Sequence, residues 1–344
     1  MSEQLVKEPA HTPEAGVLLE VSDLIVRYPI RRTIIEALKR IPRTEVHAVE
    51  GVSFAIGSGE MFALVGESGC GKTTTAQAVL RMVEPVSGSI RLGGVDITSY
   101  PPRRMRPLRR RLQMIYQDPY ESLDPRFRVR QTIEEPLLVH GIRGSRLERE
   151  ARIEEAMEVA GLTPTELFIE RYAHELSGGQ RQRVAIAASL VLGPTLLLAD
   201  EPVSMLDVSV RAGILGLLDE LRAKGLGILM ITHDLSTAAH FADHIAVMYL
   251  GRIVEEGGAK EVVRNPQHPY TKSLLSVVPA RDPRDRKTPQ ILQGETPDAV
   301  HVPPGCRFHP RCPIAEERCK IEDPALETPH SPVAEGHRAA CLLA

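Results

Sequence analysis

The glycine-rich segment at residues 66–73, GESGCGKT, constrains the fold of this chain more than any other feature. It matches the pattern G-x-x-x-x-G-K-[ST], with a short apolar run before it (62–65) and a helical pattern after it (74–82). Glycines allow backbone N–H groups to turn toward phosphate oxygens, and the N-terminus of the following helix adds positive potential. The segment therefore predicts a nucleotide site between a buried parallel strand and a helix.

The side chains of this loop have separate expected roles. Lys72 is expected to reach the β- and γ-phosphates, and Thr73 is expected to ligate Mg²⁺. Cys70 is interpreted as a filler of the loop rather than as a nucleophile. The residues assigned to nucleotide binding in this segment are Gly66, Glu67, Ser68, Gly69, Cys70, Gly71, Lys72, Thr73 and Thr74.

A second apolar run ends in two carboxylates. Residues 196–199 are Leu-Leu-Leu-Ala, and Asp200 and Glu201 follow them directly. A site that hydrolyses a nucleoside triphosphate needs one carboxylate to position Mg²⁺ and another to activate water. Asp200 fits the first role and Glu201 the second. An Asp-Glu pair after an apolar strand is a weak signal alone, but the phosphate loop makes it informative.

The sequence LSGGQ at residues 176–180 lies between these two elements. Ser177 is a good helix N-cap, so residues 180–192 are expected to form a helix that Gly193 and Pro194 end. A Ser-Gly-Gly sequence alone is also typical of an ordinary junction between a loop and a helix. Together with the phosphate loop and the Asp-Glu pair, however, it resembles the signature of the ATP-binding-cassette family.

This resemblance implies roles for further residues. Gln117, in the sequence YQDP, resembles the glutamine that senses Mg²⁺ and the attacking water, and His233 resembles the switch histidine that contacts the γ-phosphate. Asp207 resembles the D-loop aspartate, although Met205 stands where Ala is more usual. Tyr28 resembles the aromatic residue that stacks on adenine. It precedes an unusual insertion, and a core tyrosine at a strand end is the alternative.

The site implied by the resemblance combines two copies of the cassette, because the signature of one copy faces the ATP held by Lys72 of the other. The implied catalytic residues are Glu201, His233, Gln117 and Lys72. The implied Mg²⁺ ligands are Thr73, Gln117 and Asp200. The nucleotide-binding set is completed by Tyr28, Ser177, Gly178, Gly179, Gln180 and Asp207.

The fold class expected from these motifs is α/β. A mostly parallel, RecA-like core holds the phosphate loop, beside an N-terminal antiparallel β subdomain and a helical subdomain at about residues 118–190. The ATPase domain is expected to span residues 18–264, after a disordered N-terminus at residues 1–17. Residues 265–344 form a C-terminal extension, in which the polar, proline-rich residues 282–304 are expected to be an extended linker.

Three segments resemble a narrower group, the ATPases of oligopeptide and dipeptide importers. They are residues 117–126, 265–271 and 303–313. The related importers of nickel and glutathione share these features, so the cargo stays open. The resemblance implies a second ATPase subunit, identical or different, two separate permease subunits and, indirectly, an extracytoplasmic solute-binding protein. The chain is then expected at the cytoplasmic face of the cell membrane as a peripheral subunit.

Composition restricts the other classes of partner. The net charge is −3 and aromatic residues make up 4% of the chain, which disfavours nucleic-acid binding. The most apolar stretch, residues 184–199, is interrupted by polar residues, Gly and Pro and is too short to span a bilayer. Residues 103–111 carry six arginines, which are interpreted as a solvated loop; contact with acidic lipid or a partner is the alternative.

Four of the five cysteines lie in the last 40 residues, at Cys306, Cys312, Cys319 and Cys341. Four thiolates suit Zn²⁺ or a 4Fe–4S cluster. The resemblance to importer ATPases with a C-terminal cluster favours iron–sulfur, while zinc and free thiols remain as alternatives. His309, His330 and His337 are alternate ligands that are more simply surface residues. Because this tail is far in sequence from Lys72, it is expected to have a structural or partner-docking role.

Two other functional classes fit the sequence less well. A soluble cassette ATPase of DNA repair or translation would carry a long coiled-coil insertion or two cassettes, and this sequence shows neither. A metal-cluster sensor that uses ATP only structurally could lose Glu201 and His233, yet both are present.

Overall fold

A seven-stranded sheet forms the centre of the molecule, in the order β11-β10-β9-β3-β8-β7-β6. The computed structural model describes residues 16–30, 32, 44–142, 144–277, 292 and 294–344. Strands β9, β3, β8, β7 and β6 run parallel, whereas β10 and β11 are antiparallel to their neighbours. The strands are β3 (Met61–Val65), β6 (Leu112–Ile115), β7 (Leu196–Asp200), β8 (Gly227–Thr232), β9 (His244–Tyr249), β10 (Arg252–Gly258) and β11 (Arg338–Ala339).

The apolar runs of these strands are explained by burial on both faces of the sheet. Along β3, Met61, Ala63 and Val65 enter one hydrophobic cluster, whereas Phe62 and Leu64 enter the other. Successive side chains of a strand point to opposite faces, so both faces need apolar residues. Every residue of β3, β7 and β8 is buried.

An antiparallel sheet of order β2-β1-β4-β5 covers one face of this core. Its strands are β1 (Val17–Pro29), β2 (Glu45–Gly57), β4 (Ser87–Leu92) and β5 (Val95–Asp96). Residues 29–44, the expected insertion, fall largely outside the described residues, as do residues 1–15 of the expected N-terminal segment. The described part of the fold is therefore the expected α/β architecture with an antiparallel β subdomain.

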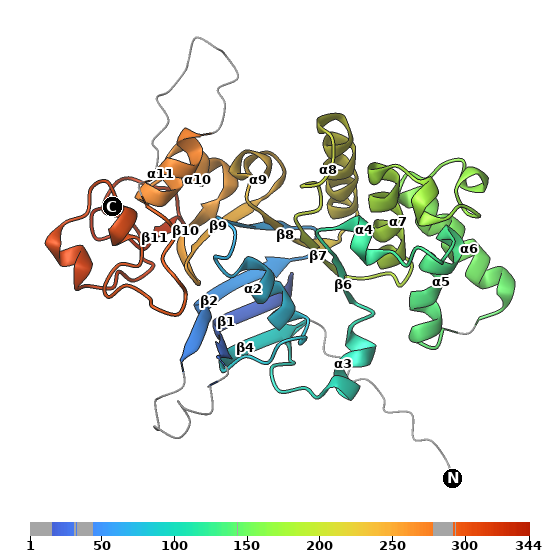
Figure 1. The fold of residues 1–344 in the computed structure, drawn as a ribbon, viewed down its shortest axis with the longest axis horizontal. Helices are drawn as coiled ribbons and strands as arrows, with labels where there is room; N and C mark the ends of the chain where they lie inside the picture. The colour runs from blue at the N-terminus through green and yellow to red at the C-terminus, as the bar shows by residue number, and fades with distance from the viewer. Residues whose placement is uncertain (1–15, 31, 33–43, 143, 278–291, 293) are drawn as a thin grey trace.

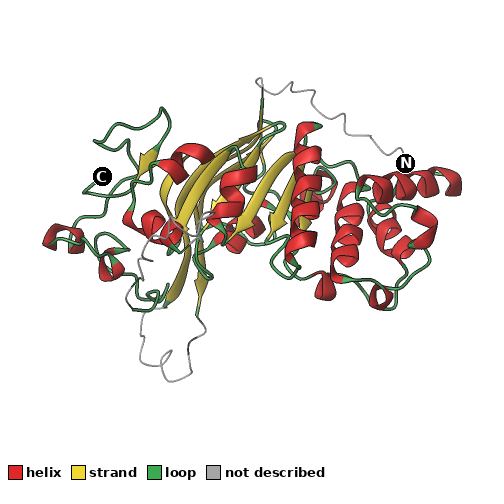
Figure 2. Ribbon diagram, turned by 90° about the horizontal axis from the view of Figure 1, so that it is seen from above, coloured by secondary structure: helices red, strands yellow, loops and turns green. Residues whose placement is uncertain are grey.

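The helices fall into two groups that Figures 1 and 2 separate clearly. One group gathers at one side of the molecule, away from the C-terminus: α4 (Pro119–Ser122), α5 (Val129–Val139), α6 (Arg146–Val159) and α7 (Gly178–Leu190), with the 3₁₀ turns η1 (Thr165–Leu167) and η2 (Ala173–Glu175). The other group accompanies the sheets: α2 (Lys72–Val79), α3 (Pro102–Leu108), α8 (Val208–Ala223), α9 (Leu235–Phe241), α10 (Ala259–Arg264) and α11 (Pro269–Ser276).

Helix ends follow the local signals in the sequence. Ser177 caps α7, where its hydroxyl accepts a bond from the N–H of Gln180 and the Gln180 side chain accepts from the N–H of Ser177. Gly161 follows α6 with a φ of 72°, a backbone conformation that glycine adopts without strain. The helix predicted at residues 180–192 therefore forms almost as expected.

The arginine-rich segment 103–111 was expected to be a solvated loop because of its charge. Helix α3 occupies most of it instead. Pro102 stands at the start of the helix, where its missing N–H costs no hydrogen bond. Met105 is the one buried residue of α3 and attaches it to the core. Arg109 donates to the carbonyls of Leu80 and Arg81, so part of this charge caps neighbouring backbone.

The described part of the C-terminal extension packs against the sheet core. β11 adds to the edge of the central sheet beside β10, and Phe308 is buried in the main hydrophobic cluster. Two 3₁₀ turns, η4 (His309–Arg311) and η5 (Glu317–Lys320), lie near the C-terminus. Of the predicted linker at residues 282–304, residues 282–291 and 293 lie outside the described residues.

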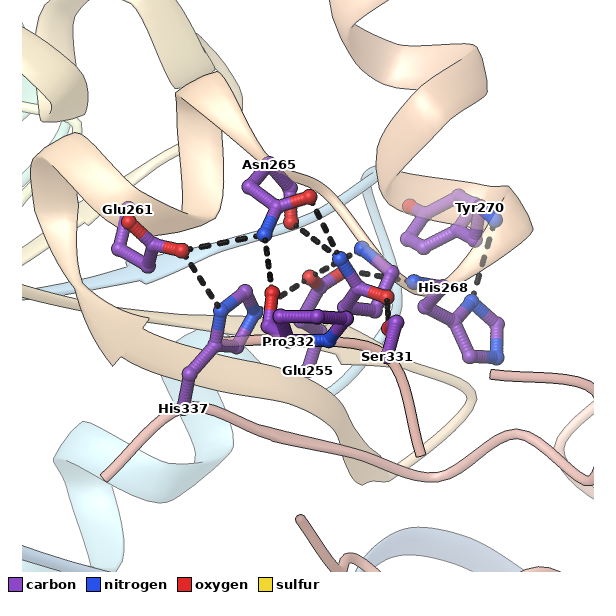
Figure 3. Close-up of polar contacts among 9 residues, drawn as sticks. Glu255, Glu261, Asn265, His268, Tyr270, Ser331, Pro332 and His337 are labelled. Atoms are coloured by element: carbon purple, nitrogen blue, oxygen red, sulfur yellow. Dashed lines mark hydrogen bonds and ion pairs between the residues drawn. The ribbon is translucent and has the colours of Figure 1, made fainter. Parts of the chain in front are cut away.

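A buried carboxylate joins the extension to the core. Glu255 of β10 is wholly buried and accepts bonds from the backbone N–H groups of Gln267 (2.7 Å) and His268 (2.9 Å). The buried ring of His337 lies 2.8 Å from the same carboxylate, through Nε2, as Figure 3 shows. The expectation that His337 is a surface residue is therefore wrong, because it supplies the partner that a buried carboxylate needs.

None of the helices in the described part of the chain is long and apolar enough to cross a membrane.

The buried His268 makes stability depend on pH. Burial lowers its pKa from 6.5 to about 4, and its Nδ1 accepts a bond from the N–H of Tyr270. As the pH falls from 6.5 toward 4, the His268 ring therefore binds a proton in the unfolded chain but stays neutral in the folded chain. The contribution of neutral His268 to the free energy of unfolding is fully present above the unfolded pKa of 6.5, and it is lost progressively as the pH falls toward 4.

We predict that His268→Asn flattens the pH dependence of stability, since Asn keeps an acceptor at the helix N-cap but does not titrate. Between about pH 7.5 and about pH 5 the wild type should lose about 2 kcal/mol more unfolding free energy than the variant. Urea denaturation at both pH values measures this difference. Equal losses in the two proteins would contradict the assignment.

Candidate nucleotide site

The phosphate loop joins β3 to α2, and its carbonyl groups surround the amine of Lys72. Lys72 is only 5% exposed, and its Nζ donates to the carbonyls of Gly66 (2.7 Å) and Glu67 (2.9 Å). A Cβ added at Gly71 would lie 2.2 Å from the carbonyl oxygen of Ala48, and Gly71 has a φ of 109°. Only glycine meets both conditions, which explains its place before the lysine.

Cys70 is buried inside this loop. Its sulfur lies 3.7 Å from the Lys72 Nζ, and burial raises the pKa of the thiol despite the nearby ammonium. A buried thiol with a raised pKa is a poor nucleophile. The surroundings of Cys70 therefore agree with its interpretation as a filler of the loop.

The Mg²⁺ ligands expected from the sequence lie together. The Thr73 hydroxyl donates to the Asp200 carboxylate at 2.9 Å, which joins the start of α2 to the end of β7. Burial raises the pKa of Asp200, and the neighbouring Glu201 carboxylate raises it further, against the effects of Thr73 and Lys72. A hydroxyl and a carboxylate are oxygen donors of the kind that Mg²⁺ takes from proteins beside nucleotide phosphates, so these residues fit the ion.

Glu201 connects two other predicted site residues. One of its carboxylate oxygens accepts a bond from the Gln117 side-chain amide at 3.1 Å. The other lies 3.3 Å from Nδ1 of His233, which follows β8. The backbone of Glu201 has a φ of 45°, a conformation that residues other than glycine seldom adopt. A cavity of about 360 Å³ opens beside Glu201 and His233.

The signature residues lie elsewhere in this chain. Ser177 is exposed and Gln180 is half-buried, and the two residues bond to each other at the start of α7. A Cβ at Gly179 would lie 2.4 Å from Val210 Cγ1 of α8, so this glycine allows the two helices to approach closely. In Figure 1, α7 stands among the helices at one side, whereas α2 lies between the central sheet and strands β1, β2 and β4. The signature and the phosphate loop therefore do not form one site within the chain.

Two remaining predicted residues sit at element ends. Tyr28 is half-buried near the end of β1, opposite Val46 of β2, and packs against the cluster beneath the antiparallel sheet. Asp207 is exposed and precedes α8. Their roles toward adenine and toward the opposite site stay predictions.

The tail, which is far from the phosphate loop in sequence, contacts it in the structure. Arg311 pairs with the Glu67 carboxylate at 2.7 Å, and the Thr296 hydroxyl donates to the same group at 2.9 Å. The Tyr270 hydroxyl accepts a bond from the backbone N–H of Glu67 at 2.9 Å. Sequence reasoning missed these residues because no local pattern relates positions that are separated by 203 residues or more.

None of the four tail cysteines, all of which lie within the described residues, forms a disulfide. Burial and, to a smaller extent, the three other thiols raise the pKa of Cys306 to about 11, although a backbone hydrogen bond from Phe308 lowers it. Within the described residues, no group of three or more His, Cys, Asp or Glu side chains is arranged to hold a metal ion. The thiols suit an iron–sulfur cluster as donors, but their side chains do not form a ready site for one. His309 lies beside Cys306, where its Nδ1 is 2.9 Å from the Cys306 carbonyl oxygen.

Comparisons with known proteins agree with this geometry. Residues 49–204 match the family described as ABC transporter. Residues 254–319 match the family described as oligopeptide/dipeptide transporter, C-terminal region.

Relatives similar to this chain align over nearly its whole length. A Brucella ovis protein named as a peptide import ATP-binding protein is 43% identical over 326 residues, which cover 94% of this chain and 97% of the relative. The oligopeptide transport ATP-binding protein AppF of Bacillus subtilis is 42% identical over 330 residues, covering 95% and 97% of the two chains.

Solved structures show the same architecture. The ATP-binding cassette MJ0796, in a dimeric post-hydrolysis state bound to ADP and Pi, has a TM-score of 0.61 and 26% identity, and covers 71% of this chain and 99% of its own. The protein cbiO1 from Clostridium perfringens, part of a transporter complex, has a TM-score of 0.62 and 28% identity over 73% and 92% of the two chains.

Proposed function

Because this chain belongs to the ABC transporter family of ATPases, we propose that it powers the import of peptides through separate membrane permease subunits. Relatives that match almost the whole chain are named for peptide and oligopeptide import. The main observation in support of ATP hydrolysis is the position of the Glu201 carboxylate, which lies between Gln117 and His233 and directly follows Asp200.

The residues of this site divide the work of hydrolysis. Lys72 would meet the β- and γ-phosphates of bound ATP, and Thr73, Asp200 and Gln117 would hold Mg²⁺. Bound Mg²⁺ neutralises the charge that develops on the phosphates. Glu201 accepts the proton of the attacking water, and His233 contacts the γ-phosphate.

The proposed catalytic unit contains two ATPase subunits. Ser177, Gly178 and Gly179 of one subunit would face the γ-phosphate held at Lys72 of the other, with Gln180 and Asp207 beside it and Tyr28 against adenine. The separation of the signature from the phosphate loop within one chain supports this arrangement. ATP binding closes the pair, and hydrolysis reopens it.

The cellular setting follows from the same proposal. Two permease subunits receive the motion through the region around Gln117, and an extracytoplasmic solute-binding protein delivers the peptide. The chain then acts as a peripheral subunit at the cytoplasmic face of the membrane. We assign residues 18–264 to the ATPase domain, with the signature subdomain at about 118–190, and residues 265–344 to the extension.

We further propose that Cys306, Cys312, Cys319 and Cys341 rearrange to bind one 4Fe–4S cluster. The position of all four cysteines within the last 40 residues and the chemical suitability of four thiolates support this proposal. Zinc and free thiols are the alternatives that the experiment below separates.

We predict that Glu201→Gln binds ATP normally but hydrolyses it roughly 10²–10⁴-fold more slowly, since the base is lost. The variant should also accumulate an ATP-bound dimer, because closure no longer leads to hydrolysis. Phosphate release and size-exclusion chromatography with ATP measure both effects. Glu154→Gln, an exposed change on α6, is the matched control. A hydrolysis rate equal to that of the wild type would remove Glu201 from the mechanism.

We predict that substitutions at Ser177 and Lys72 damage different sites of the pair. In a dimer with one distinguishable wild-type subunit, Ser177→Arg should impair the nucleotide held by the wild-type phosphate loop. Lys72→Ala should impair its own loop. Nucleotide crosslinking to each subunit assigns the occupancy. If Ser177→Arg affects only its own loop, the two-subunit site is wrong.

We predict that the chain purified without oxygen is brown and contains about four irons, as one 4Fe–4S centre requires. Cys312→Ser should abolish the colour and the iron content. Cys70→Ser, which alters the buried loop cysteine outside the cluster, should keep both. Stoichiometric zinc in colourless protein would establish the zinc alternative, and metal-free protein would establish free thiols.

A further inference from the structure

Three groups of the C-terminal extension hold one residue of the phosphate loop, Glu67. Arg311 donates to both carboxylate oxygens, at 2.7 Å through Nη1 and 3.2 Å through Nη2. Thr296 donates its hydroxyl to the carboxylate at 2.9 Å. The Tyr270 hydroxyl of α11 accepts a hydrogen bond from the backbone N–H of Glu67 at 2.9 Å. Both the side chain and the backbone of Glu67 are therefore fixed from outside the cassette motifs.

The geometry of the Arg311–Glu67 pair is that of a strong interaction. Arg311 is 8% exposed at its side chain, and its planar fork meets the carboxylate through two nitrogens. Two-point contacts of this kind are charge-assisted and fix orientation as well as distance. Burial alone would raise the pKa of Glu67, but the bonds from Arg311 and Thr296 lower it, so the carboxylate stays ionised.

The arginine is itself anchored in the core. Residues 306–312 also contain Phe308, whose ring is buried and lies 5.2 Å from Tyr249 and 5.4 Å from Tyr270 between centroids. The Arg311 guanidinium lies 5.9 Å from the centre of the Tyr249 ring. Because Tyr249 belongs to β9 of the central sheet, the position of Arg311 is set by the sheet that also carries the phosphate loop.

Glu67 is coupled to the residue that meets the phosphates. Its carbonyl oxygen accepts one of the hydrogen bonds of Lys72 Nζ. A second anchor lies nearby in the extension, where the carbonyl of Ala299 accepts a bond from the N–H of His47 of β2 at 2.9 Å. The described part of the extension that precedes the cysteines thus runs along the edge of the phosphate loop.

We propose that Arg311 is a positioning residue for the phosphate loop, which through Glu67 holds the loop in the shape that binds the ATP phosphates. This inference rests on the proposed ATPase function of the loop. Without the pair, Glu67 and the carbonyl that it presents to Lys72 sample other positions, so only a fraction of molecules is ready to bind. The measured Kd then rises by the inverse of that fraction.

The test measures ATP binding and hydrolysis by the full-length chain carrying Arg311→Gln, Glu67→Gln or both changes. Each single variant should raise the Kd for Mg·ATP roughly tenfold, the worth of a hydrogen bond between charged groups. For Arg311→Gln the rate at saturating ATP should change less than twofold, because Arg311 touches no reacting group. The double variant should bind no worse than the singles, since all three lack the same interaction.

Two further variants separate positioning from loss of structure. Arg318→Gln removes another tail arginine, which donates to the carbonyl of Leu342 and pairs with Glu316, away from the phosphate loop. It should leave the Kd unchanged. Arg311→Lys keeps the charge but loses the fork, so its Kd should lie between those of the wild type and Arg311→Gln.

The outcomes distinguish this inference from the proposed function. If the wild type does not bind ATP, the proposed function fails. If the wild type binds and Arg311→Gln shows the same Kd, or if the two single changes add fully in the double variant, the positioning role of Arg311 is wrong. A tenfold rise in Kd with an unchanged maximal rate and partial recovery in Arg311→Lys establishes it.

Discussion

The parallel pairing of β3, β8 and β7 is the constraint on which the site depends, because it brings the carboxyl ends of three buried strands to one edge. The phosphate loop follows β3, Asp200 ends β7, and His233 follows β8. Burying an unpaired charge is costly, so the polar residues of these three strands gather where the strands end. The bond from Thr73 to Asp200 and the position of Glu201 between Gln117 and His233 follow from this pairing.

Much of this arrangement could be predicted from sequence because its signals are local. A run of apolar residues on both sides of Leu64 predicts a strand buried on two faces, and the Ser177–Gln180 box predicts a helix start. The α3 helix was missed because its arginines dominate the pattern, although a single buried residue, Met105, is enough to attach it. Charge describes which face meets water, not whether the backbone is helical.

The contacts of the extension could not be predicted, since they depend on pairs that only tertiary structure brings together. His337 pairs with Glu255 across 82 positions, and Arg311 pairs with Glu67 across 244. Each residue alone reads as an ordinary surface side chain. Only when β11 joins β10 and Phe308 enters the aromatic cluster do His337 and Arg311 meet these partners, the buried carboxylate of Glu255 and the half-buried carboxylate of Glu67.

The extension is therefore continuous with the ATPase core in physical terms. A tail of this length and proline content buries too little apolar area to stabilise itself. The tail is stabilised instead by packing on the core, since Phe308 joins the main cluster and β11 extends the central sheet. The dependence runs both ways, because the tail supplies the donors for Glu255 and Glu67. Removing it would leave one carboxylate buried without its histidine and the phosphate loop without its arginine, so truncation would perturb the core as well as the tail.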